Sequence, residues 1–95
     1  MANTPYQAER LYPGFWAIEE KGVRCFLVEG GGRAMLVDTG FGTGDLKAFT
    51  TTLTQAPVFV VNTHADGDHI GCNHQFGHAW MHPAEYDRYA QRQPD

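Results

Sequence analysis

The chain has 95 residues, of which 42% are apolar and 19% are charged, and its formal net charge is −4 at pH 7. This length suits one small domain at most, and an acidic chain with scattered Lys and Arg argues against a nucleic-acid partner. No apolar run is long enough to cross a bilayer and no signal peptide is visible, so we expect no membrane partner and a cytoplasmic location.

The N-terminal part of the chain predicts short strands joined by turns. Residues 1–10 are polar and show no period, so we expect a frayed lead-in, with the domain itself spanning residues 11–95. Segments rich in β-branched and aromatic residues predict strands at 11–20, with a turn at Pro13-Gly14, at 23–29 and at 33–37. The charged segment 19–22 and the glycines 30–32 predict hairpin turns, which gives an antiparallel meander.

A strand–helix–strand crossover follows. Residues 45–54 predict an amphipathic helix that begins near Asp45. The apolar run Val58–Val61 predicts a strand covered on both faces, and parallel to 33–37 because of the crossover. Beyond it we expect a short helix to about Phe76, a brief strand at 79–81 and a helix with a partial apolar face.

The segment from Asn62 to Gly71 concentrates residues that bind metals. Four potential ligands fall within six residues: His64, Asp66, Asp68 and His69. Imidazole nitrogens and carboxylate oxygens suit zinc, iron and manganese, and such a cluster is costly unless a cation neutralises it. Gly67 and Gly71 should loosen the backbone there. The alternative interpretation is a polar loop of Asx turns in which the histidines are incidental.

This segment is similar to the His-x-His-x-Asp-His signature of the metallo-β-lactamase-fold superfamily, with Asp66 where the family usually has its second His. Leu36 to Gly40 resembles a second motif of that family, which implies that Asp38 lies beneath the metal loop and holds it by hydrogen bonds. The resemblance implies an α/β (α+β) fold in which two sheets form an αββα sandwich. This chain would supply its N-terminal half, one mixed sheet with flanking helices, so we expect a truncated domain.

The resemblance also implies a metal-dependent hydrolase. His64 and Asp66 would bind one ion, and Asp68 and His69 the other, with Asp68 also catalytic because it orients the attacking water and moves its proton. One or two zinc ions are expected, and the carboxylate of Asp66 leaves manganese and iron open. The metal-activated water would attack a small-molecule ester, amide, thioester or phosphoester. With four ligands for two ions, the 95-residue piece should bind metal weakly and be inactive alone.

Two other functions stay open from the sequence. A di-iron oxidoreductase of the flavodiiron type also carries a carboxylate, Glu, at the place of Asp66. A binding module or fragment that is catalytically inactive could keep the same residues as a relic. The sequence leaves the substrate and the oligomeric state open, because fold-level analogy does not choose the chemistry.

Cysteines and further histidines complete the candidate residues. Cys25 lies in an apolar strand pattern and should be a buried, inert thiol. Cys72 is either a small packing residue or a thiol close to the metal. Three histidines spaced by four are expected to be ordinary surface or partly packed residues, with an accessory metal site as the alternative: His74, His78 and His82.

Overall fold

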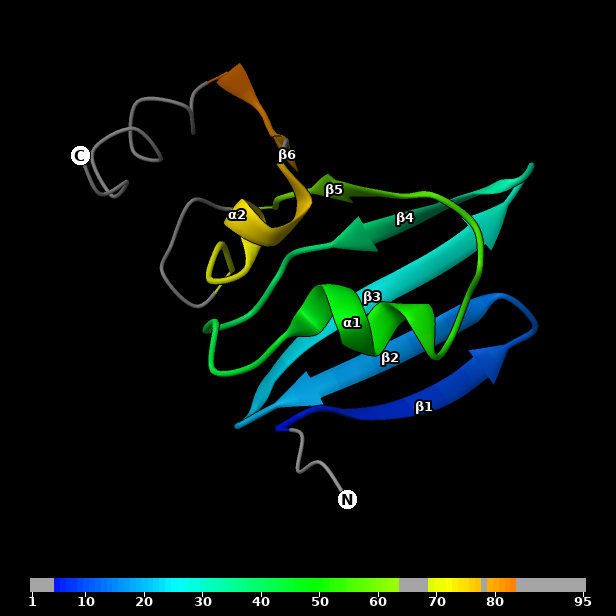
Figure 1. The fold of residues 1–95 in the computed structure, drawn as a ribbon, viewed down its shortest axis with the longest axis horizontal. Helices are drawn as coiled ribbons and strands as arrows, with labels where there is room; N and C mark the ends of the chain where they lie inside the picture. The colour runs from blue at the N-terminus through cyan, green and yellow to red at the C-terminus, as the bar shows by residue number, and fades with distance from the viewer. Residues whose placement is uncertain (1–4, 64–68, 78, 84–95) are drawn as a thin grey trace.

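Six strands form one mixed sheet in the computed structural model, which describes residues 5–63, 69–77 and 79–83 (Figure 1). The strands lie side by side in sequence order: β1 Gln7–Tyr12, β2 Phe15–Glu20, β3 Val23–Gly30, β4 Arg33–Val37, β5 Val58–Val61 and β6 Ala79–Trp80. Neighbours from β1 to β4 are antiparallel, whereas β4, β5 and β6 are parallel. The predicted meander, the parallel strand after the crossover and the α+β class are confirmed.

The N-terminal prediction was wrong for residues 7–10, which belong to β1 and not to a frayed lead-in. β1 pairs with β2 from Gln7 opposite Glu19 to Tyr12 opposite Phe15, so the predicted strand 11–20 is divided between two strands. Every residue of β1 is exposed. An edge strand held mainly by its backbone ladder needs no apolar alternation, so its side chains gave no periodic signal.

The β2–β3 turn is shorter than the charged segment 19–22 indicated. Only Lys21 and Gly22 form it, with φ of 49° and 88°, as a two-residue hairpin turn requires. Glu20 is therefore the last residue of β2, and its side chain is only 1% exposed. The sequence prediction that placed Glu20 in the hairpin turn was wrong.

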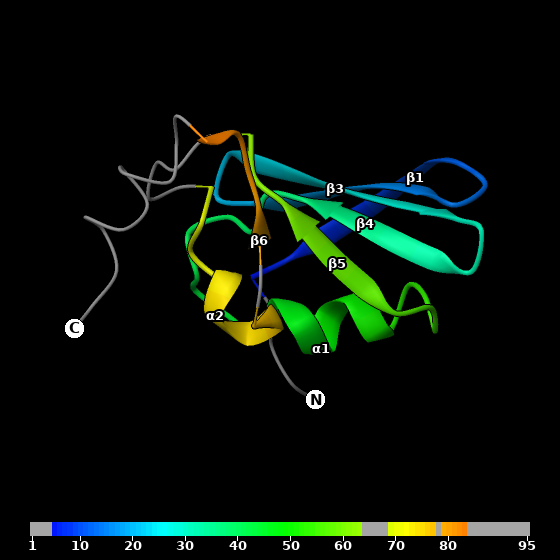
Figure 2. The same cartoon turned by 90° about the horizontal axis from the view of Figure 1, so that it is seen from above.

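Two short helices lie on the same face of the sheet (Figure 2). α1 (Leu46–Thr51) connects β4 to β5, and the Asp45 carboxylate caps it by accepting a hydrogen bond from the Ala48 amide at 3.0 Å. α2 (Asn73–Phe76) connects β5 to β6. The helix expected after Met81 lies outside the described residues. None of the described helices is long and apolar enough to cross a membrane.

The apolar core lies between the sheet and these helices. Leu27, Leu36 and Val60 are direct partners across β3, β4 and β5, and each is 0% exposed. Leu46 of α1 is equally buried against them, and Phe49 packs at its side. This core fixes the ends of β4 and β5, which carry the residues of the candidate site.

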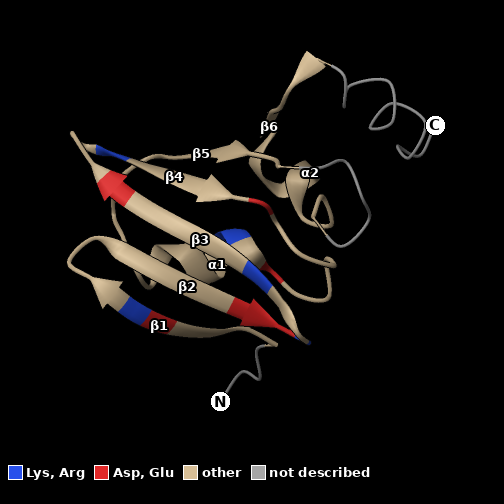
Figure 3. Cartoon of the chain, turned by 180° about the vertical axis from the view of Figure 1, so that it is seen from behind, with Lys and Arg blue, Asp and Glu red and all other residues tan. Residues whose placement is uncertain are grey.

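The opposite face of the sheet is apolar but only partly covered within the described residues. Alternation along the strands places on this face Phe15, Phe26, Val28, Met35, Val37, Phe59, Val61 and Trp80. Charged residues of β2, β3 and β4 lie toward the strand ends (Figure 3). Phe59 is 37% and Trp80 58% exposed, so the described residues leave this face of β5 partly open, whereas the sequence predicted cover on both faces.

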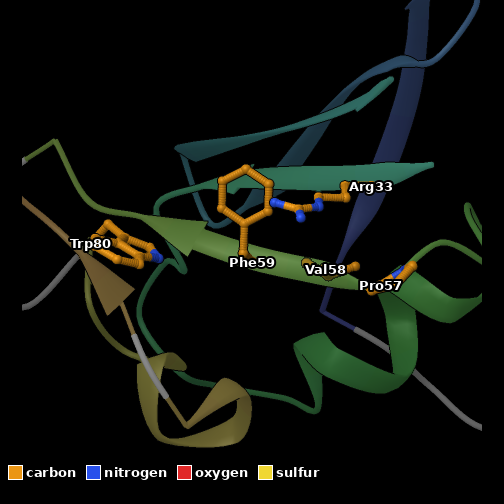
Figure 4. Close-up of a pocket in the computed structure, with 5 residues that line it drawn as sticks. All are labelled: Arg33, Pro57, Val58, Phe59 and Trp80. Carbon is orange, nitrogen blue, oxygen red and sulfur yellow. The ribbon is translucent and has the colours of Figure 1, made fainter. Parts of the chain in front are cut away.

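A hollow of about 410 Å³ opens at this face beside β5 (Figure 4). It is lined by Arg33, Pro57, Val58, Phe59 and Trp80. The Phe59 and Trp80 rings and the Arg33 side chain border it from three neighbouring strands. Arg33 begins β4 and Val58 begins β5, so the hollow lies toward the amino ends of these strands, away from their carboxyl ends.

The core assignment predicts a difference between two identical substitutions. Leu36→Ala should lower the free energy of unfolding by about 2–5 kcal/mol, because it leaves a cavity among fully buried neighbours. Leu11→Ala on the exposed strand β1, where Leu11 is 40% exposed, should change it by no more than about 0.5 kcal/mol. Urea unfolding of both variants measures the difference, and equal losses would contradict the assignment.

Candidate metal centre

The candidate site begins where two parallel strands end side by side. Val37 of β4 is the partner of Val61 of β5, and Asp38 and Asn62 are the next residues. The backbone continues the pairing by one step, since the Asp38 amide donates to the Val61 carbonyl at 2.8 Å and the Asn62 amide to the Trp80 carbonyl at 2.7 Å. Polar side chains therefore meet at the carboxyl ends of the parallel strands.

The Asp38 carboxylate joins the two ends of the segment 64–68. One oxygen accepts from the Thr63 amide at 2.8 Å, and the other from the Thr63 hydroxyl at 2.7 Å. Nδ1 of His69 lies 2.9 Å from that second oxygen. Asp38 is 4% exposed and has φ of 67°, a left-handed conformation that short polar side chains tolerate best. One buried acid thus contacts the residues before and after the segment.

A network of buried polar groups fixes the backbone of His69. Its carbonyl accepts from the Thr39 amide at 2.8 Å and from Nδ2 of Asn62 at 3.1 Å. Asn62 and Asn73 exchange amide hydrogen bonds at 2.6 and 3.2 Å, and the Thr39 hydroxyl donates to Asn73 at 2.8 Å. The same hydroxyl accepts from the Cys72 amide at 3.0 Å. Such a network is rigid because each buried group would be costly to leave unpaired.

Gly71 allows two loops to touch. Its amide donates to the Gly40 carbonyl at 2.7 Å, and a Cβ at Gly71 would overlap the backbone of Phe41 and Gly42. The sequence interpretation of Gly71 as a residue that loosens the backbone was wrong, because here the missing side chain permits close packing. The comparable expectation for Gly67 lies outside the described residues.

Both thiols are buried, as predicted for Cys25. Burial raises the pKa of Cys25 to about 12. Burial also raises the pKa of Cys72, whose sulfur lies 3.4 Å from the Tyr6 hydroxyl and 3.5 Å from the Gly44 carbonyl oxygen. Burial and the Cys72 contact together raise the pKa of the Tyr6 hydroxyl. These contacts favour the packing interpretation of Cys72.

Of the four ligands predicted from the sequence, the structure describes His69. The other three, His64, Asp66 and Asp68, lie outside the described residues, so their role as ligands stays a prediction. Among residues 5–63, 69–77 and 79–83, no group of three or more His, Cys, Asp and Glu side chains is placed to hold a metal. His74 and His82 are exposed, and His78 also lies outside the described part.

The sequence analysis did not predict the buried polar residues that lie beside the segment 64–68 and its flanking loops. Thr39, Asn62 and Asn73 are each at most 3% exposed, and Glu20 is 1% exposed. Thr39 and Asn62 follow directly after apolar strand runs, which was the available signal. Nothing in the local sequence indicated that Asn73 or Glu20 would be buried, because their partners are distant along the chain.

Comparison with protein families identifies the class of this arrangement. The family described as the metallo-beta-lactamase superfamily matches residues 18–93, which includes both the strand-end acid and the His-Asp segment. The chain therefore belongs to the metallo-beta-lactamase superfamily. No curated protein matches the chain.

Solved structures with the same fold are about twice as long or longer. The metallo-beta-lactamase DIM-1 superimposes with a TM-score of 0.75 at 14% identity, covering 97% of this chain and 49% of its own. A metallo-beta-lactamase from Hirschia baltica gives 0.74 at 20% identity, with 94% and 48% covered. One from Cronobacter sakazakii gives 0.72 at 18% identity, with 92% and 38% covered. These likenesses confirm the predicted fold, of which the chain spans half or less.

The geometry around Asp38 predicts the effect of changing one atom. Asp38→Asn keeps the size and the left-handed conformation, but puts a donor NH2 group in place of one carboxylate oxygen. If the remaining oxygen still accepts from the Thr63 amide, the nitrogen faces the Thr63 hydroxyl and Nδ1 of His69 and cannot accept from either. Unfolding free energy should fall by about 1–3 kcal/mol, because buried donors lose their acceptor. The Nδ1 resonance of His69 should also shift in ¹⁵N–¹H spectra of the imidazole.

Asp45→Asn is the matched control, because asparagine caps a helix as well as aspartate. It should leave both the stability and the His69 resonance unchanged. An unchanged His69 resonance in Asp38→Asn would contradict the contact between the two side chains.

The buried thiols predict slow chemistry in the folded protein. Since the pKa of Cys25 rises from 9.0 to about 12, its thiolate fraction at pH 8 should be about a thousandfold lower than in the unfolded chain. Iodoacetamide should therefore modify Cys25 only in urea.

The same pKa difference makes the free energy of unfolding depend on pH. Above pH 9 the Cys25 thiol loses its proton in the unfolded chain but keeps it in the folded chain, so the free energy of unfolding should fall as the pH rises toward 12.

Mass spectrometry of tryptic peptides after timed alkylation measures the modification of Cys25 and of Cys72 separately. Rapid modification of Cys25 in the native protein at pH 8 would contradict its burial.

Proposed function

We propose that the protein is a metal-dependent hydrolase of the metallo-beta-lactamase superfamily, which uses a metal-activated water to cleave a small-molecule ester, amide, thioester or phosphoester. The observation that carries this proposal is the Asp38 carboxylate, buried between Thr63 and His69. A buried acid that holds a histidine at the edge of a His- and Asp-rich segment is how proteins orient imidazoles that bind metal.

The donor chemistry of this segment fits a divalent ion. When Nδ1 of His69 donates its proton to Asp38, the lone pair of the ring lies on Nε2, which is the form in which imidazole binds a metal. His64, Asp66, Asp68 and His69 would hold one or two ions, zinc in our proposal, with manganese and iron compatible with the carboxylates. A bound ion of this kind lowers the pKa of water toward neutrality and polarises the scissile bond.

The chain's own residues supply orientation and proton transfer. Asp38 keeps the proton of His69 at Nδ1 and fixes the ring plane, while Thr39 and Asn62 hold the His69 carbonyl. Ring and backbone are thus both held before any ligand binds, which lowers the cost of ordering the site. Asp68, by its place in the motif, would orient the attacking water and accept its proton.

The remaining parts of the proposal rest on composition. An acidic chain favours a small-molecule substrate over nucleic acid. The two free cysteines are compatible with a reducing compartment, and we propose the cytoplasm.

Metal titration tests the proposal directly. Isothermal calorimetry with Zn²⁺ and Mn²⁺ should show weak binding to the 95-residue chain, because the motif offers four ligands to one or two ions. His69→Ala should lower the affinity by more than about tenfold, since a direct ligand is lost.

His74→Ala is the matched control, because His74 is an exposed histidine on α2 outside the motif. It should bind metal as the parent chain does. Metal binding that survives His69→Ala unchanged would contradict the assignment of ligands, and tight binding of two ions would contradict the expectation of a weak site.

A further inference from the structure

Glu20 is a buried acid that the proposed chemistry does not use. It ends β2 on the helix side of the sheet, where it is 1% exposed. Its neighbour Glu19 points to the other face and forms an exposed ion pair with Arg24 at 2.8 Å. Two adjacent glutamates therefore differ in burial and partners, so the burial of Glu20 calls for a specific cause.

That cause is the loop at residues 40–43, whose residues Phe41 and Thr43 contact the carboxylate. One carboxylate oxygen of Glu20 accepts from the Phe41 amide at 2.9 Å. The other accepts from the Thr43 amide at 2.9 Å and from the Thr43 hydroxyl in a short hydrogen bond. Within the described residues no Lys, Arg or His forms an ion pair with this carboxylate. The loop's donors therefore compensate its burial, and the loop cannot move away without leaving a buried acid unpaired.

The same loop contacts the segment that follows the metal motif. The Gly40 carbonyl accepts from the Gly71 amide at 2.7 Å, two residues after His69. A Cβ at Gly40 would overlap the Glu20 carboxylate, and a Cβ at Gly42 would be 3.0 Å from the Gly71 carbonyl carbon. Loop 40–43 is thus packed between Glu20 on one side and Gly71 on the other.

We propose that Glu20 is a positioning residue for the metal-binding segment, acting through loop 40–43 on Gly71 and His69. The hydrogen bonds of the Glu20 carboxylate go to Phe41 and Thr43, so the proposed effect on His69 is indirect. Its carboxylate fixes the loop, the loop fixes Gly71, and Gly71 sets where the chain leaves the motif. The link to metal binding rests on the proposed function, whereas the link to the backbone of Gly71 does not.

Amide hydrogen exchange in the intact protein tests the backbone link without metal. Glu20→Gln keeps the size but replaces an acceptor oxygen with a donor that faces other donors. Exchange of the Gly71 amide should speed up at least about tenfold, because charge-assisted hydrogen bonds are lost. Amides in the interior of β3 and β4 should stay within about twofold, and the matched control Glu19→Gln should change neither set.

A second pair of variants covers the case in which Glu20→Gln does not fold. Thr43→Ala removes only the hydroxyl donor, whereas Thr43→Ser keeps it. Faster Gly71 exchange in Thr43→Ala but not in Thr43→Ser supports the proposal, and wild-type exchange in both overturns it. An even rise across β3, β4 and Gly71 in Glu20→Gln would also overturn it, because it would show a purely global role.

Zinc affinity, measured by competition with a chromogenic chelator, tests the link to the metal. Glu20→Gln should bind Zn²⁺ at least about tenfold more weakly than wild type, as found when residues that orient ligands are removed. Equal affinity in a variant whose Gly71 amide has loosened would overturn the positioning role. If wild type itself binds no zinc, the proposed function fails, and the exchange results alone then decide the backbone link.

Discussion

One carboxylate, that of Asp38, connects the sheet to the candidate site. The backbone of Asp38 extends the hydrogen-bond ladder between β4 and β5, and its side chain contacts Thr63 and His69. The position of the metal motif therefore depends on the pairing of two parallel strands in the middle of the sheet. Because Asp38 is buried, its partners cannot be exchanged for water without cost, which makes this connection stiff.

The sequence predicted the parts of the fold whose signals are local. β3, β4 and β5 are apolar runs bounded by turn residues, and Asp38 was found because it follows one of them in a recognisable motif. β1 was missed because an exposed edge strand carries no apolar period. Exact helix ends were also missed, since α1 ends at Thr51, where threonine hydroxyls bond to carbonyls three residues earlier.

Side-chain partners across long sequence separations could not be predicted. Glu20 looks like a turn residue until loop 41–43 is placed beside it, and Asn73 looks like a surface helix residue until it meets Asn62. In each case hydrogen-bond donors from distant parts of the chain offset the cost of burying a polar side chain, and a local sequence pattern does not indicate such partners. The coordination of His64, Asp66 and Asp68 remains a prediction of the motif alone.

The contacts that support the site also constrain the order in which it can assemble. His69 is 31 residues from Asp38, and Asn73 is 34 residues from Thr39. Closing loops of that size lowers the entropy of the chain, so we expect these hydrogen bonds to form after α1 has docked and β5 has paired with β4. During folding, the hairpins β1–β2 and β2–β3 can form from neighbouring residues, whereas a chain halted at that stage would lack the contacts of Asp38 with Thr63 and His69.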